Sequence, residues 1–462
     1  MRPAVDPRAA FQSVDFDWVA RLDSVWRDAV ADVPDLHFQQ RAEVTQRLDG
    51  LSAGPAVEHG SELGLVYVGN PGSGKTHFLS FVRHQAFARR LHFVLVDMTD
   101  VRDFWSILVL GYLDSLARPA GDHRTQLQLV LQKLIESGVN VAPSEKAVDL
   151  LSVQSAKILK AASDDILQEL NRRGSCDPAD LQSHQDVVRA LLLLNSRDFE
   201  TSSIGHTWLQ GVGIDDVEAR RFGIKNPKRS RSGILKGLSW CMSLSAPAVL
   251  AFDQLDAIVA EQDLAAGDRA QVERDEAQKA ALSIIESIAG GLAAVVDQTR
   301  RTLPIVTALN RTWMVLQQRG LQAHKDRFKD PPAVLRPIEN SDLVASIVGT
   351  RLSAAYKRAG FQPAYATWPF QPAFFKGLEG AFPRQVLQKC DEHKRRCAAK
   401  NEVTELGWTR EEIAVETPPA SPGAASKFDT MLRNATPDPS LLSQEQEDVL
   451  GELVLRGCEA FS

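Results

Sequence analysis

The sequence has no long apolar run and no strong excess of either charge. None of its 462 residues lies in a stretch apolar enough to cross a bilayer, and the amino terminus lacks the apolar core of a signal peptide. We therefore expect a cytoplasmic protein with no membrane contact. The formal net charge of −6 gives no overall attraction to nucleic acid, so any such contact must come from a local patch.

Cysteine is also scarce. The five cysteines form no C-x-x-C pair and are odd in number, which argues against a disulfide framework or a zinc site and favours a reducing compartment. The apolar fraction of 44% and the charged fraction of 24% are ordinary for a globular protein. The length allows about two to three domains of ~150 residues each.

The most informative segment is a glycine-rich stretch at residues 69–76, which reads Gly-Asn-Pro-Gly-Ser-Gly-Lys-Thr. It matches the phosphate-binding loop (P-loop) at every fixed position. An apolar run, Leu63–Val68, precedes it as a predicted buried strand, and a helical pattern follows from His77. The glycines let consecutive backbone N–H groups turn toward phosphate oxygens, and the helix amino terminus adds a partial positive charge.

This motif gives two side chains defined roles. Lys75 can reach the β- and γ-phosphates, and the hydroxyl of Thr76 can ligate Mg²⁺. A chance glycine-rich turn is the alternative, but it requires every position to match by coincidence. We therefore predict that ATP and Mg²⁺ bind at these residues: Gly69, Asn70, Pro71, Gly72, Ser73, Gly74, Lys75, Thr76 and His77.

Four further apolar runs alternate with helical patterns and predict buried strands at Leu91–Met98, Pro247–Phe252, Leu303–Asn310 and Ala333–Ile338. Strands that alternate with helices imply parallel pairing. The predicted fold class is therefore α/β: a three-layer P-loop NTPase with a parallel five-stranded sheet, a large helical insertion and a small C-terminal helical lid.

The insertion separates the second strand from the third. Helical patterns at Phe104–Leu116, Leu127–Ile135 and Val187–Leu194 fill this segment, and a structureless loop of its length is improbable. The predicted organisation is a helical lead-in at 1–60 that packs on the nucleotide domain, a core at 61–338 with the insertion at about 101–240, a lid at 339–400 that includes helical Pro372–Ala399, a linker at 401–442 and a terminal helix at 443–462.

The terminal helix begins at an N-cap, Ser443, with Gln446 three residues later. Its apolar face continues to the final residue without a stop signal. We therefore expect a partner for this face, or a chain that is a fragment of a larger protein.

The strand 247–252 ends in an acid, Asp253, which can hold Mg²⁺ directly or through water. The next residue is Gln254, where many ATPases of this type have glutamate. Glutamine can orient the attacking water but cannot accept its proton. Either Asp256 or another acid takes that role, or hydrolysis is slow and the protein is a nucleotide-gated switch. The alternative for Asp256 is a cap on a helix near 257–260.

The order of these motifs resembles the AAA+ superfamily, in particular its initiator-like and STAND-like branches. The resemblance covers roughly 60–400 apart from the insertion, and Gln254 departs from it. It implies that Asn310 is the sensor 1 residue, Arg327 the arginine finger and Arg384, after Pro383, the sensor 2 arginine. An arginine finger that acts in trans further implies a homo-oligomer or other subunits as partners.

Within the insertion, Trp208-Leu209-Gln210-Gly211 followed by Phe222-Gly223-Ile224 is similar to a pattern in ATPases of bacterial phage-defence systems, including bacteriophage-exclusion operons. That resemblance implies a motor or switch in a multi-protein antiviral defence complex. The alternative is that the aromatic residues are core anchors and the glycines are turns.

Two basic stretches could contact phosphates without reading sequence: a predicted loop at 220–236 and a helix at 389–400. A solvated charged face is the alternative for both. Three functions therefore remain open: a defence-associated AAA+/STAND-like ATPase, a DNA-handling initiator or clamp-loader-like ATPase, and a nucleotide-dependent scaffold with little hydrolysis.

Overall fold

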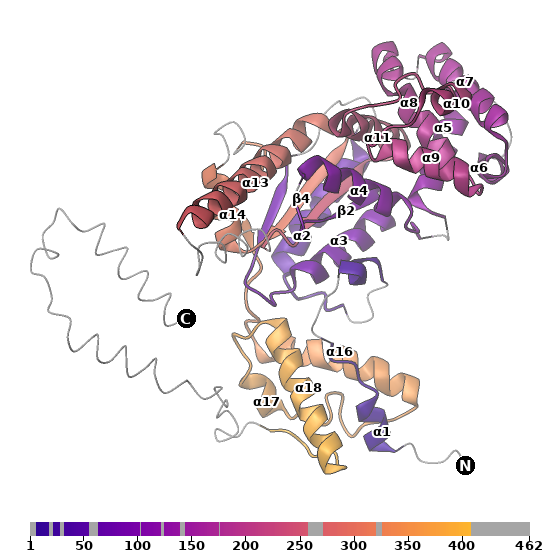
Figure 1. The fold of residues 1–462 in the computed structure, drawn as a ribbon. Helices are drawn as coiled ribbons and strands as arrows, with labels where there is room; N and C mark the ends of the chain where they lie inside the picture. Colours follow the sequence, from indigo (N-terminus) through magenta and orange to yellow (C-terminus); the bar gives the residue numbers. More distant parts are fainter. Residues whose placement is uncertain are drawn as a thin grey trace, which may run out of the picture. The chain divides into compact units, whose positions relative to one another are not determined.

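A five-stranded, all-parallel sheet of order β2-β3-β4-β1-β5 forms the centre of the protein (Figure 1). The strands are Leu65–Val68 (β1), His92–Asp97 (β2), Ala248–Asp253 (β3), Thr302–Ala308 (β4) and Ala333–Val334 (β5). The predicted α/β class and the parallel five-stranded sheet are therefore confirmed. The computed structural model describes residues 6–17, 22–27, 32–54, 63–101, 103–121, 124–138, 144–174, 176–256, 271–319 and 326–407.

The predicted terminal helix at 443–462, and the linker beyond residue 407, lie outside these described residues. Among the described helices, none is both long enough and apolar enough to cross a bilayer.

Strand β5 is shorter than the predicted Ala333–Ile338. The amide of Leu335 still donates to Val68 O at 2.7 Å, but Pro337 has no N–H to continue the ladder. The amide of Ile338 instead donates to Ala381 O at 2.9 Å, and its side chain joins a separate helical core. The chain therefore leaves the sheet after two paired residues.

Helices cover both faces of the sheet, as the alternation of buried strand residues requires. On one face, Leu65 and Tyr67 pack with helices α2 (Phe38–Ala53) and α3 (Lys75–Ala88). On the other face, Val66 and Val68 share a core with the helices that follow β2, β3 and β4. The latter two strands are followed by α13 (Gln271–Gln298) and α14 (Asn310–Arg319).

The segment between β2 and β3 is helical, and the helices expected at 104–116, 127–135 and 187–194 are present. Its elements are α4 (Phe104–Leu116), α5 (Gln126–Gly138), α6 (Ser144–Ser152), α7 (Ala156–Arg172), α8 (Pro178–Leu194), α9 (Phe199–Leu209), α10 (Asp216–Phe222) and α11 (Arg231–Ser245). Figure 1 shows α5 to α10 gathered beyond α4 and α11, which lie nearer to the sheet. One continuous apolar core links them all.

A second helical cluster follows β5 and has its own apolar core. It comprises α16 (Ser341–Ala359), α17 (Pro372–Lys376) and α18 (Pro383–Lys400). The prediction of a single helix over 372–399 is wrong in one respect, because the helix is interrupted between α17 and α18. Gly380 there has a φ of +82°, which glycine adopts without strain, and Pro383 fits the first turn of the new helix.

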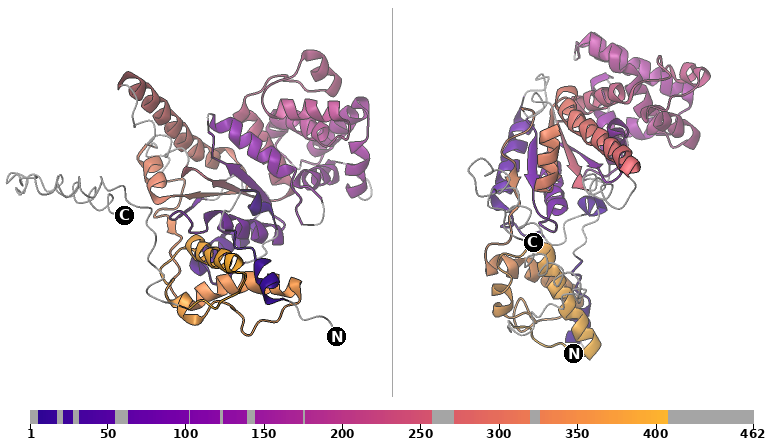
Figure 2. Two further views of the ribbon diagram at one scale, coloured as in Figure 1. Left: turned by 60° about the horizontal axis from the view of Figure 1, so that its bottom comes forward. Right: turned by 60° about the vertical axis from the view of Figure 1, so that its left-hand side comes forward.

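The amino-terminal segment divides between the two cores. Helix α1 (Pro7–Gln12) packs on the second cluster, where the ring of Phe370 lies 5.9 Å from Phe11 and 6.0 Å from Phe16. In Figure 2 the indigo α1 lies beside the orange and yellow helices. Only the later part, η1 (Leu22–Trp26) and α2, packs on the sheet, so the expectation that all of 1–60 packs there is wrong for α1.

Candidate functional site

The glycine-rich loop 69–76 connects β1 to α3 at the carboxyl edge of the sheet. Gly72 and Gly74 have φ values of +83° and +95°, a region that strongly favours glycine. A Cβ at Gly72 would also lie 2.6 Å from the Cβ of Arg384, so no side chain fits there. The loop therefore needs glycine at both positions.

The topology places this loop at a crevice. Helix α3 after β1 packs on one face of the sheet through Phe78 and Leu79, whereas α14 after the neighbouring β4 packs on the other face through Trp313 and Leu316. Adjacent parallel strands whose following helices diverge leave an opening at their carboxyl ends, where open α/β sheets bind ligands.

Lys75 lies at the centre of this opening. Its Nζ donates to Gly69 O at 2.9 Å and lies 3.5 Å from Asp256 Oδ2. The other oxygen of Asp256 accepts a hydrogen bond from the amide of Leu309 at 2.7 Å. Asp256 therefore joins the glycine-rich loop to the end of β4. The alternative role of Asp256, a cap on a helix near 257–260, concerns a segment outside the described residues.

The expected metal ligands face each other. The hydroxyl of Thr76 donates to Asp253 Oδ2 at 2.7 Å, and Thr307 on β4 donates to Oδ1 at 2.6 Å. Asp253 is 1% exposed. Burial raises the pKa of this carboxyl above its usual range, although the hydrogen bonds from Thr307 and Thr76 oppose the shift.

This donor set suits Mg²⁺, which prefers oxygen ligands and binds through one or two carboxylates together with substrate phosphates and water. Among the residues that the structure describes, no group of three or more His, Cys, Asp or Glu is placed to hold a metal ion. A metal ion beside Thr76 and Asp253 would therefore rely on oxygens of a bound ligand and of water.

The side chain of Gln254 is fixed by a hydrogen bond to a neighbouring residue. Its backbone has a φ of +65°, which is uncommon for a residue with a side chain. Its Oε1 accepts a hydrogen bond from the hydroxyl of Thr99, whose amide donates to Asp97 Oδ1 at 3.0 Å. The side chain thus links the ends of β2 and β3.

A cavity of about 550 Å³ opens in front of the loop. Arg384, at the start of α18, lines it, and its amide approaches Gly72 O at 3.3 Å. Most of the apolar lining comes from the amino-terminal segment and from the second cluster: Val33, Leu36, Ile347, Pro383 and Leu387. The site therefore has a polar end at the loop and an apolar wall.

Sequence reasoning missed two cationic or basic side chains here, His37 and Arg351. The Nε2 of His37 donates to Ser73 O at 2.8 Å, and burial lowers the pKa of this imidazole, which favours its neutral form. Arg351 on α16 lines the cavity. No motif marks either residue, because each comes from a segment distant in sequence from the loop.

Not all predicted loop residues face the cavity. Gly69 and Ser73 pack on each other, since a Cβ at Gly69 would lie 2.4 Å from Ser73 Oγ. Asn70 is exposed, and its carbonyl accepts from the amide of Ser73 at 3.0 Å. His77 lines the cavity, with its Nε2 3.4 Å from Asp32 Oδ1.

Two predicted residues lie apart from this group. Asn310 is exposed at the start of α14, where its amide nitrogen lies 3.9 Å from Met314 Sδ. Arg327 lies at the amino end of β1, since Gly64 N donates to its carbonyl at 3.0 Å. Its guanidinium pairs with Asp297 at 2.8 Å. Within one chain, Arg327 therefore does not reach the loop 69–76.

The Trp208 motif of the insertion is part of the apolar core. Trp208 and Phe222 are each 1% exposed, and the indole Nε1 donates to Asn226 O at 2.9 Å. Gly223 ends α10 with a φ of +74°. These contacts favour the interpretation of aromatic anchors and turn glycines.

The basic stretch 220–236 is not a single loop as expected, because α10 extends to Phe222 and α11 begins at Arg231. Arg231 pairs with Asp103 at 3.3 Å. The exposed cations of this stretch are Arg220, Arg221, Lys225, Lys228 and Lys236.

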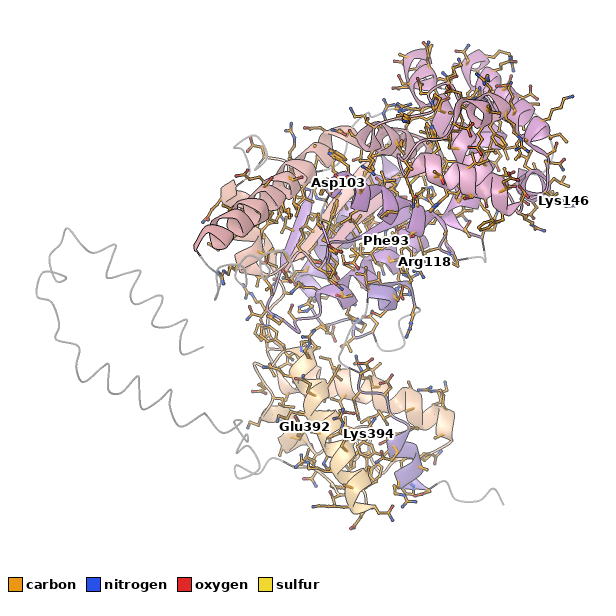
Figure 3. All side chains as sticks on the ribbon, in the orientation of Figure 1. Phe93, Asp103, Arg118, Lys146, Glu392 and Lys394 are labelled. Atoms are coloured by element: carbon orange, nitrogen blue, oxygen red, sulfur yellow. The ribbon has the colours of Figure 1, made fainter. Side chains whose placement is uncertain are left out.

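The basic stretch 389–400 lies on α18 (Pro383–Lys400), as expected, and three of its five cations contact groups of the protein. Lys389 pairs with Glu392 at 3.0 Å, and Lys394 donates to Val14 O at 2.9 Å. Arg395 pairs with Asp391 at 2.7 Å. Figure 3 shows Glu392 and Lys394 on this helix. These pairs reduce the positive charge that the helix offers to phosphates.

Comparison with known proteins adds no relative. No protein-family model, no curated protein and no solved structure gave a significant match. The functional argument therefore depends on the residues and their geometry.

Proposed function

We propose that this chain binds ATP with Mg²⁺ at residues 69–76 and hydrolyses it slowly, as a P-loop ATPase of AAA+/STAND-like type. One observation carries the proposal. Lys75, Thr76 and Asp253, which come from two strand ends far apart in sequence, meet at one cavity that Arg384 also lines. A polyphosphate needs this combination of backbone N–H groups, two cations and a metal-ligating pair.

Each residue would have a distinct role in nucleotide binding. The amides of the glycine-rich loop and the amino terminus of α3 bind phosphate oxygens, and Lys75 exchanges its contacts with Gly69 and Asp256 for the β- and γ-phosphates. Bound Mg²⁺ would neutralise charge that develops on the phosphates. The hydroxyl of Thr76 and the carboxylate of Asp253 would provide oxygen ligands for Mg²⁺. Arg384 of α18 would add a second cation beside the phosphates.

The apolar wall suits the base and ribose of the nucleotide. A volume of about 550 Å³ lies within the range of small-molecule pockets. Val33, Leu36, Ile347 and Leu387, which share one apolar core, all line the cavity. Residues 339–400 would then act as a lid, because a bound nucleotide would touch this cluster and the loop together.

Slow hydrolysis is expected because Gln254 stands where many such ATPases have glutamate, so that the proton acceptor must be another acid, such as Asp256 at the cavity. The amide oxygen of Gln254 already accepts a hydrogen bond from Thr99, and an amide cannot take a proton from water. Phosphoryl transfer depends mainly on positioning and charge stabilisation, so turnover remains at a reduced rate. A nucleotide state that persists suits a switch better than a fast motor.

For the biological role, we propose a switch or motor in a bacterial phage-defence complex, on the resemblance of 208–211 and 222–224 to ATPases of such systems. A DNA-handling ATPase is the second candidate. Exposed cations on α10 and in 223–230 favour it, because clustered Lys and Arg bind phosphates without sequence readout.

The test of the core proposal is equilibrium binding of a fluorescent ATP analogue, with Mg²⁺ and with EDTA. We expect saturable binding that unlabelled ATP displaces and that weakens when Mg²⁺ is removed, because the metal screens the phosphates beside Asp253. Binding that ATP cannot displace would contradict the proposal.

Arg327 gives a prediction about assembly. We propose that it completes the site of a neighbouring subunit, since in its own chain it lies at the amino end of β1 and pairs with Asp297. Arg327→Ala should then lower turnover at least ~10³-fold with little change in ATP affinity, because the arginine stabilises charge formed during transfer. Mixing this variant with Lys75→Ala subunits should restore part of the activity.

The mixing experiment can also contradict the proposal that Arg327 acts in a neighbouring subunit. Mixed oligomers with no recovered turnover, or a monomer that is fully active, count against a trans role. Asp297→Asn is the matched control, because it removes the pairing carboxylate and leaves the arginine in place.

A further inference from the structure

A second arginine faces the same cavity from the lid side. Arg351 lies on α16, one helical turn after Ile347, and both residues line the cavity together with Arg384 from α18. The two arginines thus come from different helices of one apolar core. No sequence motif assigns a role to Arg351.

Arg351 has little that balances its charge. Within the described part of the chain, its one side-chain hydrogen bond runs from NH1 to Ile347 O of its own helix, at a long 3.3 Å. Among the residues that the structure describes, no carboxylate forms an ion pair with it, whereas Lys75 in the same cavity contacts Asp256. Burial lowers the pKa of this guanidinium, although Cys390 and Asp15 oppose the shift, and the net direction reflects the cost of holding the charge away from water.

We propose that Arg351 binds the polyphosphate of the nucleotide, as a second lid cation beside Arg384. The inference rests on the proposed function, since the ligand must be a phosphate ester at 69–76. A guanidinium keeps its charge at all physiological pH values and presents paired N–H groups that match phosphate oxygens. A multiply charged ligand would thus supply a direct ion pair, which none of the described carboxylates makes with Arg351.

This placement would also connect the lid to the ligand. Arg384 is held beside Gly72 by the hydrogen bond from its own amide to Gly72 O at 3.3 Å. Arg351 reaches the cavity from the other helix, so a polyphosphate would be held by α16 and α18 together. Nucleotides with more phosphates should then hold the lid more firmly.

The experiment compares Arg351→Met and Arg351→Lys with the wild type, measuring affinity for ATP, ADP and GTP by competition with the fluorescent analogue. Methionine keeps the apolar stem but removes the charge. We expect Arg351→Met to lose ATP affinity about 10-fold or more, as for a lost charge-assisted hydrogen bond, and Arg351→Lys to recover part of it. The preference for ATP over GTP should stay unchanged.

The control is Arg358→Met on the same helix, an exposed arginine that does not line the cavity. It should bind ATP as the wild type does. The melting temperature of ligand-free Arg351→Met should equal or exceed that of the wild type, because a buried charge without an ion pair is removed, while its increase on addition of ATP should be smaller.

Two results overturn the inference alone: ATP affinity that is unchanged in Arg351→Met, or a loss that also alters the ratio of ATP to GTP affinity, which indicates contact with the base. A wild-type protein that binds no nucleotide, or a Lys75→Ala variant that binds as tightly as the wild type, overturns the proposed function instead, and this inference with it.

Discussion

Lys75→Ala is expected to weaken ATP binding at least ~100-fold, the largest effect on affinity in this protein. Its ammonium is the loop's own cation, and in the ligand-free site it lies between Gly69 O and Asp256. A buried charge-assisted contact contributes about 3 kcal/mol, and every 1.4 kcal/mol is a factor of ten in affinity. Equilibrium titration with a fluorescent ATP analogue measures the change.

The loss should come from the ligand contact rather than from misfolding. Lys75 is the first residue of α3, and alanine is a good helix former at that position. Circular dichroism and the melting temperature of the ligand-free variant should therefore stay near wild type. Lys389→Ala, which removes an exposed lysine paired with Glu392, is the matched control and should leave affinity unchanged. Tight ATP binding by Lys75→Ala would show that the site lies elsewhere.

Local sequence signals were sufficient for the sheet and for the loop. Buried parallel strands are short continuous apolar runs, so Leu65–Val68 and Ala248–Asp253 could be recognised without tertiary information. The glycines of 69–76 could be recognised as well, because the positive φ values at Gly72 and Gly74 are a local backbone requirement. Asp253 could be assigned because it directly ends an apolar strand.

The end of the edge strand β5 and the interruption between α17 and α18 were harder to predict from the sequence. The run Ala333–Ile338 is apolar enough for a strand. However, Pro337 cannot continue the strand pairing, and the hydrogen bond from Ile338 N to Ala381 O draws the chain into the core of the second helical cluster. Likewise, the pattern over 372–399 has helical periodicity on both sides of Gly380. In each case contacts between distant segments decided the boundary, and such contacts leave no periodic signal.

Some residues of the site could not be predicted for the same reason, because contacts between distant segments bring them together. His37 and Arg351 come from segments before and after the sheet in sequence, and only tertiary packing brings His37 to Ser73 of the loop and Arg351 to the cavity. Thr307 and Thr99 are ordinary strand-end residues until Asp253 and Gln254 lie beside them. Arg327 is the opposite case, because the resemblance assigned it a catalytic role but within its own chain it lies at the amino end of β1 and pairs with Asp297.

The second large effect concerns the proton acceptor of hydrolysis. Asp256 is the acid nearest to Lys75, at 3.5 Å, and it lines the cavity. When phosphates draw Lys75 away, one oxygen of Asp256 is released toward the cavity while the other stays bonded to Leu309 N. Asp256→Asn should therefore lower single-turnover hydrolysis ~100-fold or more, the usual contribution of a positioned base.

The matched variant is Gln254→Glu, which adds an acid at the family's usual position. If Asp256 is the base, this change should alter the rate little, since the side chain is held by Thr99 at the end of β2. ATP affinity should change little in both variants, because asparagine and glutamate conserve size and neither residue is a proposed phosphate ligand. A rate that rises in Gln254→Glu and is unaffected in Asp256→Asn would mean that the wild type works without a base, as a switch whose ATP state persists because Gln254 can only orient the water.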